Sequence, residues 1–138
     1  MPAARAHHHA YEGGLAAHTL EVTNYAAGIA NVVANVDMDV LMTAALWHDF
    51  HKISEYSDDS ADAGYRDTIG HICGSAIEFR HWSHAHGVDR VTFRKVAHCI
   101  LAHHGPVREW GSPVAPQTIE AMILHQADML SANFGATK

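Results

Sequence analysis

Residues 44–53 read AALWHDFHKI, an apolar run that ends in an adjacent histidine and aspartate, His48 and Asp49. A second histidine and a lysine, His51 and Lys52, follow directly after one aromatic residue. Imidazoles and carboxylates rarely enter apolar surroundings unless they are paired or bind a metal. The function of the pair therefore depends on whether the rest of the chain supplies partners for it.

Five segments, one of which contains this stretch, have the apolar spacing of helices, and none has the alternation of a strand. Asp39 is predicted to cap the helix that carries His48, and Asp89 and Thr118 to cap the fourth and fifth helices. The expected helices cover residues 15–36, 40–56, 68–86, 90–104 and 119–134. The sequence thus predicts one all-α domain over residues 1–138, a helical bundle of about five main helices.

The composition narrows the function classes. The net charge of −6 argues against a broad basic surface for duplex nucleic acid, although bound metals would make a site locally positive. No apolar run of about 18 residues and no signal-peptide core is present, so we expect a cytoplasmic protein with no membrane segment. Cys73 and Cys99 lie in apolar helical patterns and are expected to be buried thiols. The 14 histidines are far above ordinary usage, and histidine is the commonest metal ligand.

Each expected helix carries an imidazole or a carboxylate within or beside apolar residues. In chain order these candidate ligands are His18, His48, Asp49, His71, His103, His104 and Asp128. Such nitrogen and oxygen donors suit manganese, iron, nickel or zinc. We expect two divalent transition metals that share Asp49, because a carboxylate can bridge two metals and a histidine cannot. One set of expected ligands is His18, His48, Asp49 and Asp128, and the other is His71, His103 and Asp49.

This ligand set suits hydrolysis by a metal-activated water. Two metals about 3.5–4 Å apart can clamp the attacking and leaving oxygens and acidify a bound water toward a pKa of about 7, which gives a metal-bound hydroxide. Asp49, Lys52 and His104 are the expected catalytic residues. Lys52, His104 or His51 could neutralise developing charge or protonate the leaving oxygen.

The order H…HD…H…H…D resembles the HD superfamily of metal-dependent phosphohydrolases. Four segments are similar to the HD domain of the YhaM-type 3′–5′ exoribonucleases: PAARAHHHAYEGGLAAHT (2–19), LWHDFHKISEY (46–56), IGHI (69–72) and LAHHGPVREWGSPVAPQTIEAMILHQAD (101–128). The resemblance implies 3′–5′ exonuclease action on single-stranded nucleic acid, and it favours His103 over His104 as a ligand. In that family an OB-fold domain precedes the HD domain. Because this chain starts at the HD boundary, we expect the OB-fold to be absent.

Five further positions bear on the comparison with that family. His51 replaces a usual glycine, and Ser131 replaces a usual acidic residue. His8 and His9 match the family's histidine pair and are expected at the substrate opening. Trp110 in the loop 105–116 could offer a face to a base or only pack.

Other functions remain open from the residues alone. A nucleotide or cyclic-nucleotide phosphohydrolase would use the same ligands, as would a di-iron oxygenase, and a regulatory module could keep the fold without catalysis. The sequence does not decide whether the substrate is RNA or DNA, how many metals bind, or what the oligomeric state is. His81, His84 and His86 are expected to face solvent.

Overall fold

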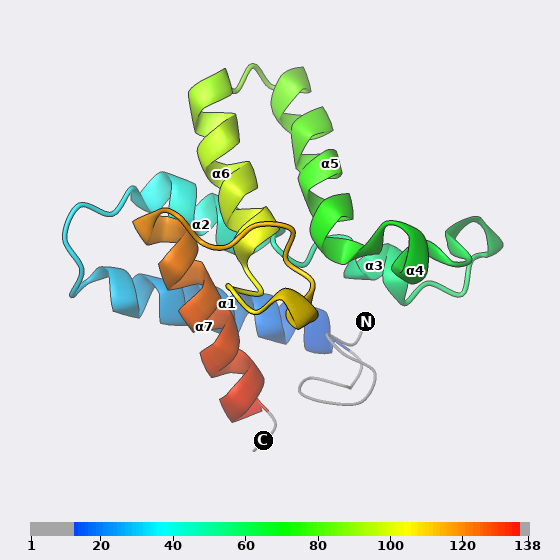
Figure 1. The fold of residues 1–138 in the computed structure, drawn as a ribbon, viewed down its shortest axis with the longest axis horizontal. Helices are drawn as coiled ribbons and strands as arrows, with labels where there is room; N and C mark the ends of the chain where they lie inside the picture. Colours follow the sequence, from blue (N-terminus) through cyan, green and yellow to red (C-terminus); the bar gives the residue numbers. More distant parts are fainter. Residues whose placement is uncertain (1–12, 136–138) are drawn as a thin grey trace.

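The computed structural model describes residues 13–135, and these residues contain helices and no strand (Figure 1). The predicted all-α fold with five main helices is confirmed. The five long helices are α1 (Gly14–Ala30), α2 (Met38–Trp47), α5 (Gly70–Ala85), α6 (Arg90–Ala102) and α7 (Ile119–Gly135). Two one-turn helices, α3 (Lys52–Glu55) and α4 (Tyr65–Thr68), and two 3-10 turns, Ser60–Asp62 and Arg108–Trp110, complete the order.

The predicted helix over residues 40–56 is wrong, because the chain breaks it into α2 and α3. α2 ends at Trp47, and His48 to His51 form a turn before α3 begins. Within that turn the backbone N–H of His51 donates to Ser75 Oγ of α5 at 3.0 Å. A contact from a distant helix thus stabilises the break, which lets the side chains of His48 and Asp49 both point inward, with at most 2% of either exposed.

Two of the three predicted helix caps are confirmed. Asp89 accepts hydrogen bonds from the N–H groups of Val91 and Thr92, and Thr118 accepts one from Ala121. The predicted Asp39 cap is wrong: Asp37 accepts from the N–H of Val40, and Asp39 lies inside the first turn. The first helix also ends at Ala30 rather than at residue 36, and Asn35 has a left-handed backbone with φ 61°.

The core lies where α1, α2, α6 and α7 pack together, with α5 beside α6 (Figure 1). Its largest apolar side chains are Phe79, Leu41, Ile100, Leu124 and Val22. Burying each such side chain contributes roughly 1.5–3 kcal/mol. The ends of α2 and α6 and the start of α5 meet beside α1 and α7, and most of the candidate ligands lie on these elements.

The cysteine prediction is half right. Cys99 is buried in the core, whereas Cys73 lies exposed on α5, so its prediction as a buried thiol is wrong. Apolar residues lie on both faces of that helix, so the pattern does not decide which of them are buried. Ile77, for example, is apolar and exposed. His81, His84 and His86 are exposed as predicted. Within residues 13–135, no helix has the length and apolar character needed to cross a bilayer.

Candidate metal centre

Asp49 stands at the centre of the polar cluster, and its two carboxylate oxygens face different histidines. Oδ2 lies 3.2 Å from His18 Nε2 and 3.4 Å from His48 Nε2. Oδ1 lies 3.3 Å from His71 Nε2 and 3.4 Å from His103 Nε2. Only 2% of the Asp49 side chain is exposed. One buried carboxylate therefore joins two histidine pairs that come from four parts of the chain.

The first group combines His18 of α1, His48 after α2 and Asp128 of α7. His18 Nε2 lies 3.0 Å from Asp128 Oδ1 and 3.3 Å from His48 Nε2, and His48 Nε2 lies 3.9 Å from Asp128 Oδ1. One donor atom from each of the three residues lies within 4.8 Å of the others, a spacing that could hold one metal ion. Both histidines are fully buried, and Asp128 is 15% exposed.

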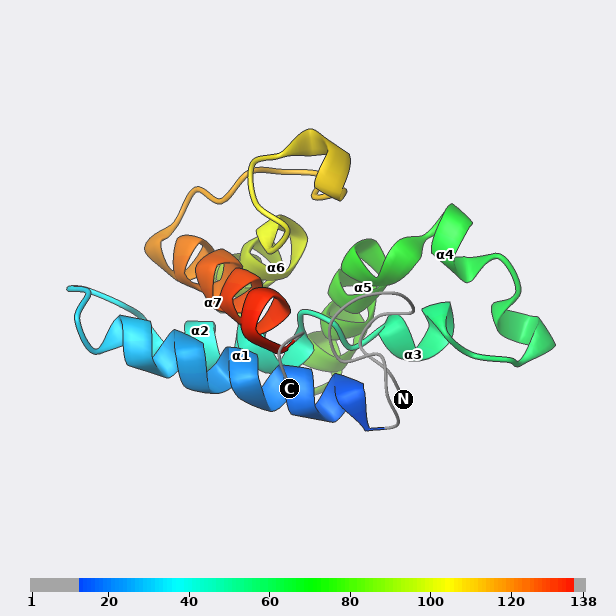
Figure 2. The same ribbon diagram turned by 90° about the horizontal axis from the view of Figure 1, so that it is seen from below.

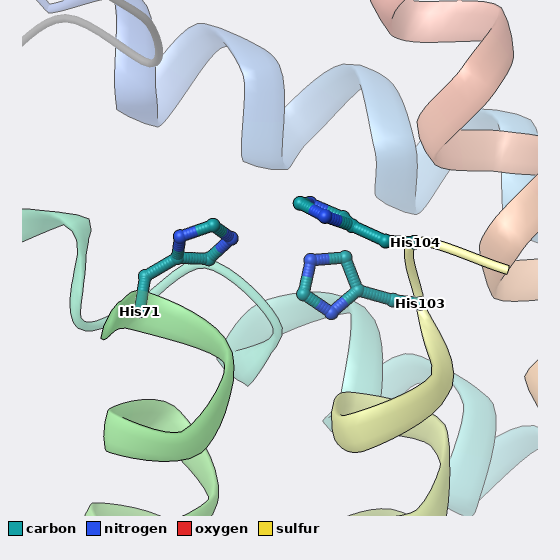
Figure 3. A group of neighbouring side chains, drawn as sticks. All are labelled: His71, His103 and His104. Atoms are coloured by element: carbon teal, nitrogen blue, oxygen red, sulfur yellow. The ribbon is translucent and has the colours of Figure 1, made fainter. Parts of the chain in front are cut away.

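The second group contains His71, His103 and His104, whose donor atoms also lie within 4.8 Å of one another. Figure 3 shows the ring of His71 from α5 pointing toward the two rings that follow α6. The ring centroid of His71 lies 5.6 Å from that of His103 and 5.1 Å from that of His104. The structure thus brings both adjacent histidines to the cluster, and only His103 lies against the shared Asp49 oxygen.

Hydrogen bonds on the far side of each ring leave the Nε2 atoms available as ligands. His48 Nδ1–H donates to the carbonyl of Ala45 at 2.7 Å, and His103 Nδ1–H donates to the carbonyl of Ile100 at 2.6 Å. A carbonyl can only accept, so in each neutral ring the proton sits on Nδ1 and the lone pair on Nε2. Both lone pairs point toward Asp49, as metal ligation requires.

Three buried atoms at this centre make no hydrogen bond within residues 13–135, namely Asp49 Oδ1, His71 Nε2 and His103 Nε2. A buried polar atom left unsatisfied costs about 1–3 kcal/mol, and three at one point are unusual in a native fold. A single cation between them would satisfy all three. The donor set therefore fits a divalent transition metal on the Oδ1 side of Asp49.

The charges at the centre follow from burial and from close partners. Burial opposes charge on Asp128 and Asp49, but hydrogen-bonded His18 lowers the pKa of Asp128 and the Lys52 ammonium lowers that of Asp49, both well below their usual range. Burial also opposes charge on His18, yet the two carboxylates raise its pKa to about 9. Burial lowers the pKa of His103 to about 3. Both carboxylates are thus ionised and His103 is neutral, which are the forms that metals bind.

Lys52 is held inside the centre rather than free in solvent. Its Nζ lies 2.6 Å from Asp49 Oδ2, and only 9% of its side chain is exposed. Burial disfavours its charge, but the Asp49 carboxylate raises its pKa, so the ammonium stays charged. Lys52 thus keeps Asp49 ionised and places a positive charge beside it.

The supporting roles of three residues, Glu55, Ser131 and Glu21, were missed in the sequence. Glu55 Oε1 accepts from the backbone N–H of His71 at 2.7 Å and lies 3.0 Å from His71 Nδ1. Ser131 Oγ lies 2.9 Å from His18 Nδ1 and donates to Glu21 Oε2 at 2.9 Å. Ser131 thus links His18 to a carboxylate on α1. Two signals were present in the sequence: Glu55 follows Lys52 by three residues, and Ser131 replaces a residue that is usually acidic in the similar family.

Three other expected site residues have different outcomes. His51 turns away from the cluster: its Nδ1 lies 2.8 Å from the Tyr65 hydroxyl and its Nε2 lies 3.7 Å from Glu78. A role for His51 at the reacting atoms is therefore not favoured. His8 and His9 lie outside the described residues.

The HD domain family matches residues 15–133, which include every candidate ligand. The chain belongs to the HD domain family. It is 35% identical over 134 residues to the 3′-5′ exoribonuclease YhaM of Bacillus subtilis, 34% identical over 133 residues to that of Bacillus pumilus, and 33% identical over 134 residues to that of Listeria monocytogenes. No solved structure matches the chain significantly.

These matches cover 95–96% of this chain but only 42% of each relative. The chain thus spans less than half the length of the curated relatives. The relatives carry the name 3′-5′ exoribonuclease, and the part of them that this chain matches is the part that contains the HD domain.

Proposed function

We propose that this protein is a phosphohydrolase that uses two divalent transition metals, among manganese, iron, nickel and zinc, to degrade single-stranded nucleic acid from its 3′ end. The observation that carries the proposal is that the two carboxylate oxygens of Asp49 face different histidine pairs. Oδ2 faces His18 and His48, and Oδ1 faces His71 and His103. The similarity to exoribonucleases supports the substrate and the direction of attack.

The chain's own residues would hold the metals in two adjoining sets. His18, His48, Asp128 and Asp49 Oδ2 would bind one ion, and His71, His103 and Asp49 Oδ1 the other. When bound, such a pair polarises a phosphoryl group and lowers the pKa of a water molecule. Glu55 would orient His71 through its Nδ1, and Ser131 would orient His18 in the same way.

Two further residues border the same space. Lys52 keeps a positive charge beside Asp49 where charge develops on a phosphoryl group, which is the role of a preorganised electrostatic group. His104 Nδ1–H is tied to the carbonyl of Trp110, so Nε2 is the nitrogen that can meet substrate or metal. Both residues line a cavity of about 510 Å³ at the centre.

The proposal is tested with a 5′-labelled single strand of RNA and one of DNA, each incubated with the chain and with manganese, iron, nickel or zinc in turn. A ladder that shortens from the 3′ end is expected with at least one metal. The Asp49→Asn variant is the matched control and should leave the strand whole. Strands that stay intact with every metal would refute the exonuclease.

A nucleotide or cyclic-nucleotide phosphohydrolase is the second candidate. The cavity of about 510 Å³ is in the size range of a site for one small ligand. A panel of mononucleotides and cyclic nucleotides run beside the labelled strands separates the two, because an exonuclease should favour the polymer.

A further inference from the structure

Among residues 13–135, Lys52 and Arg66 are the lysine and arginine that border the cavity at the metal centre, and they differ in their partners. Lys52 is paired with Asp49 at 2.6 Å, so its charge is largely balanced. Arg66 of α4 is exposed at the rim, and its guanidinium has no hydrogen bond or ion pair within residues 13–135. In a chain with a net charge of −6, a cation at the rim favours the approach of an anionic substrate. Within the part of the chain that the structure describes, Arg66 is therefore the arginine or lysine of this cavity whose charge is available to a substrate.

The fold holds the neighbouring Tyr65 in place, and with it the helical turn that carries Arg66. The ring of Tyr65 stacks on His51 at a centroid distance of 5.4 Å, and its hydroxyl lies 2.8 Å from His51 Nδ1. A Cβ on Gly74 of α5 would lie 2.0 Å from that hydroxyl and 3.0 Å from His51, so the stack depends on a glycine there. α3 and α4 consequently lie together at the start of α5 (Figure 2).

Other parts of the cavity lining are aromatic and apolar. Trp110, which is 46% exposed, and Ile69, which is 47% exposed, both line it. The Trp110 turn is tied to the centre, because His104 donates from its backbone N–H to Ser112 Oγ at 3.0 Å and from Nδ1 to the Trp110 carbonyl. An aromatic face and a guanidinium on one cavity are the combination that binds a base and a backbone phosphate of a single strand.

We propose that Arg66 binds a backbone phosphate of the strand other than the phosphate that is cleaved. This inference rests on the proposed function and adds a subsite to it. The planar guanidinium can hold two phosphate oxygens at once, and the His51–Tyr65 stack fixes where it does so. The cavity would then accommodate a segment of strand rather than one phosphoester alone.

The test compares Arg66→Ala with Arg94→Ala, which removes an equal charge from an exposed position on α6 outside this cavity. The substrates are a ten-nucleotide single strand and a dinucleoside monophosphate, whose one phosphate is the one cleaved. Arg66→Ala should raise KM for the strand about 10-fold or more, the worth of one charge-assisted hydrogen bond, with kcat nearly unchanged. KM for the dinucleoside monophosphate should not change, and Arg94→Ala should change neither.

Salt dependence gives a second readout. Loss of one phosphate contact should reduce the slope of log KM against log salt by about 0.7 for a single strand. An unchanged strand KM in Arg66→Ala, equal losses on both substrates, or an equal loss in Arg94→Ala would each overturn the assignment.

Tyr65→Ala tests the positioning role of the stack. It should raise the strand KM as Arg66→Ala does, and the double variant should show no further rise. Additive losses would overturn positioning through Tyr65.

If no metal supports cleavage, the proposed exonuclease activity is refuted separately from the Arg66 subsite. Binding of the labelled strand to Arg66→Ala and to the unaltered chain is then compared by fluorescence anisotropy. Equal affinity of Arg66→Ala and the unaltered chain would overturn the subsite.

Discussion

Replacing Asp49 by asparagine should separate two tasks of its carboxylate, which are the ion pair with Lys52 and the binding of metal ions. The side chain keeps its size but loses its charge, and Lys52 Nζ then loses the ion-pair partner that lies at 2.6 Å. Breaking a buried pair on one side costs about 3–5 kcal/mol, because the remaining charge stays out of water. In a chain of this size that corresponds to a fall in Tm of roughly 10–20 °C for the metal-free protein.

The double variant Asp49→Asn with Lys52→Met supplies the control. It removes the stranded ammonium, so most of the lost stability should return. It should still bind no metal pair, because neither side of residue 49 then offers a carboxylate. Circular dichroism in chelator gives Tm, and metal analysis after dialysis gives the ion content. If the single variant Asp49→Asn melted at the same temperature as the unaltered chain, or if the double variant held two ions, the argument would be refuted.

Three further outcomes are expected. Glu55→Ala should weaken manganese binding in calorimetry by about 10- to 100-fold, because His71 loses the carboxylate at its Nδ1, while the exposed Glu78→Ala should not; equal effects would count against this. Ser131→Ala removes the hydroxyl at 2.9 Å from the buried Nδ1 of His18 and should cost about 1–3 kcal/mol in chelator-treated protein, and an unchanged Tm would contradict it. The pKa of His18 is raised from 6.5 to about 9 in the metal-free fold, so the stability from its proton is complete below pH 6.5 and is lost as the pH rises through 9. The Tm of chelated protein should therefore fall between about pH 7 and 10, and a rise would oppose this assignment.

Much of the centre could be predicted because its residues lie in surroundings that favour few other roles. His18, His48 and Asp128 each stand in an apolar helical stretch, where an imidazole or a carboxylate needs a partner. Helical spacing then limits which faces can meet. The chain order of the candidates adds the resemblance to HD proteins, and the family match supports it.

The rest depends on contacts between distant residues, which spacing along one helix does not reveal. The break after Trp47 is stabilised by Ser75. Its hydroxyl accepts a hydrogen bond from the backbone N–H of His51, which lies 24 residues earlier in the chain. Ser131 meets His18 across 113 residues. His103 and His104 both follow the end of α6 at Ala102, and both rings extend to the side that faces His71 (Figure 3).

The most direct test of the account is anomalous scattering from crystals of the chain grown with manganese. Two peaks are expected, one beside Asp49 Oδ2 among His18, His48 and Asp128, and one beside Oδ1 between His71 and His103. A single peak, or ions held by other residues while these atoms stay bare, would contradict the claim that this carboxylate joins two metals.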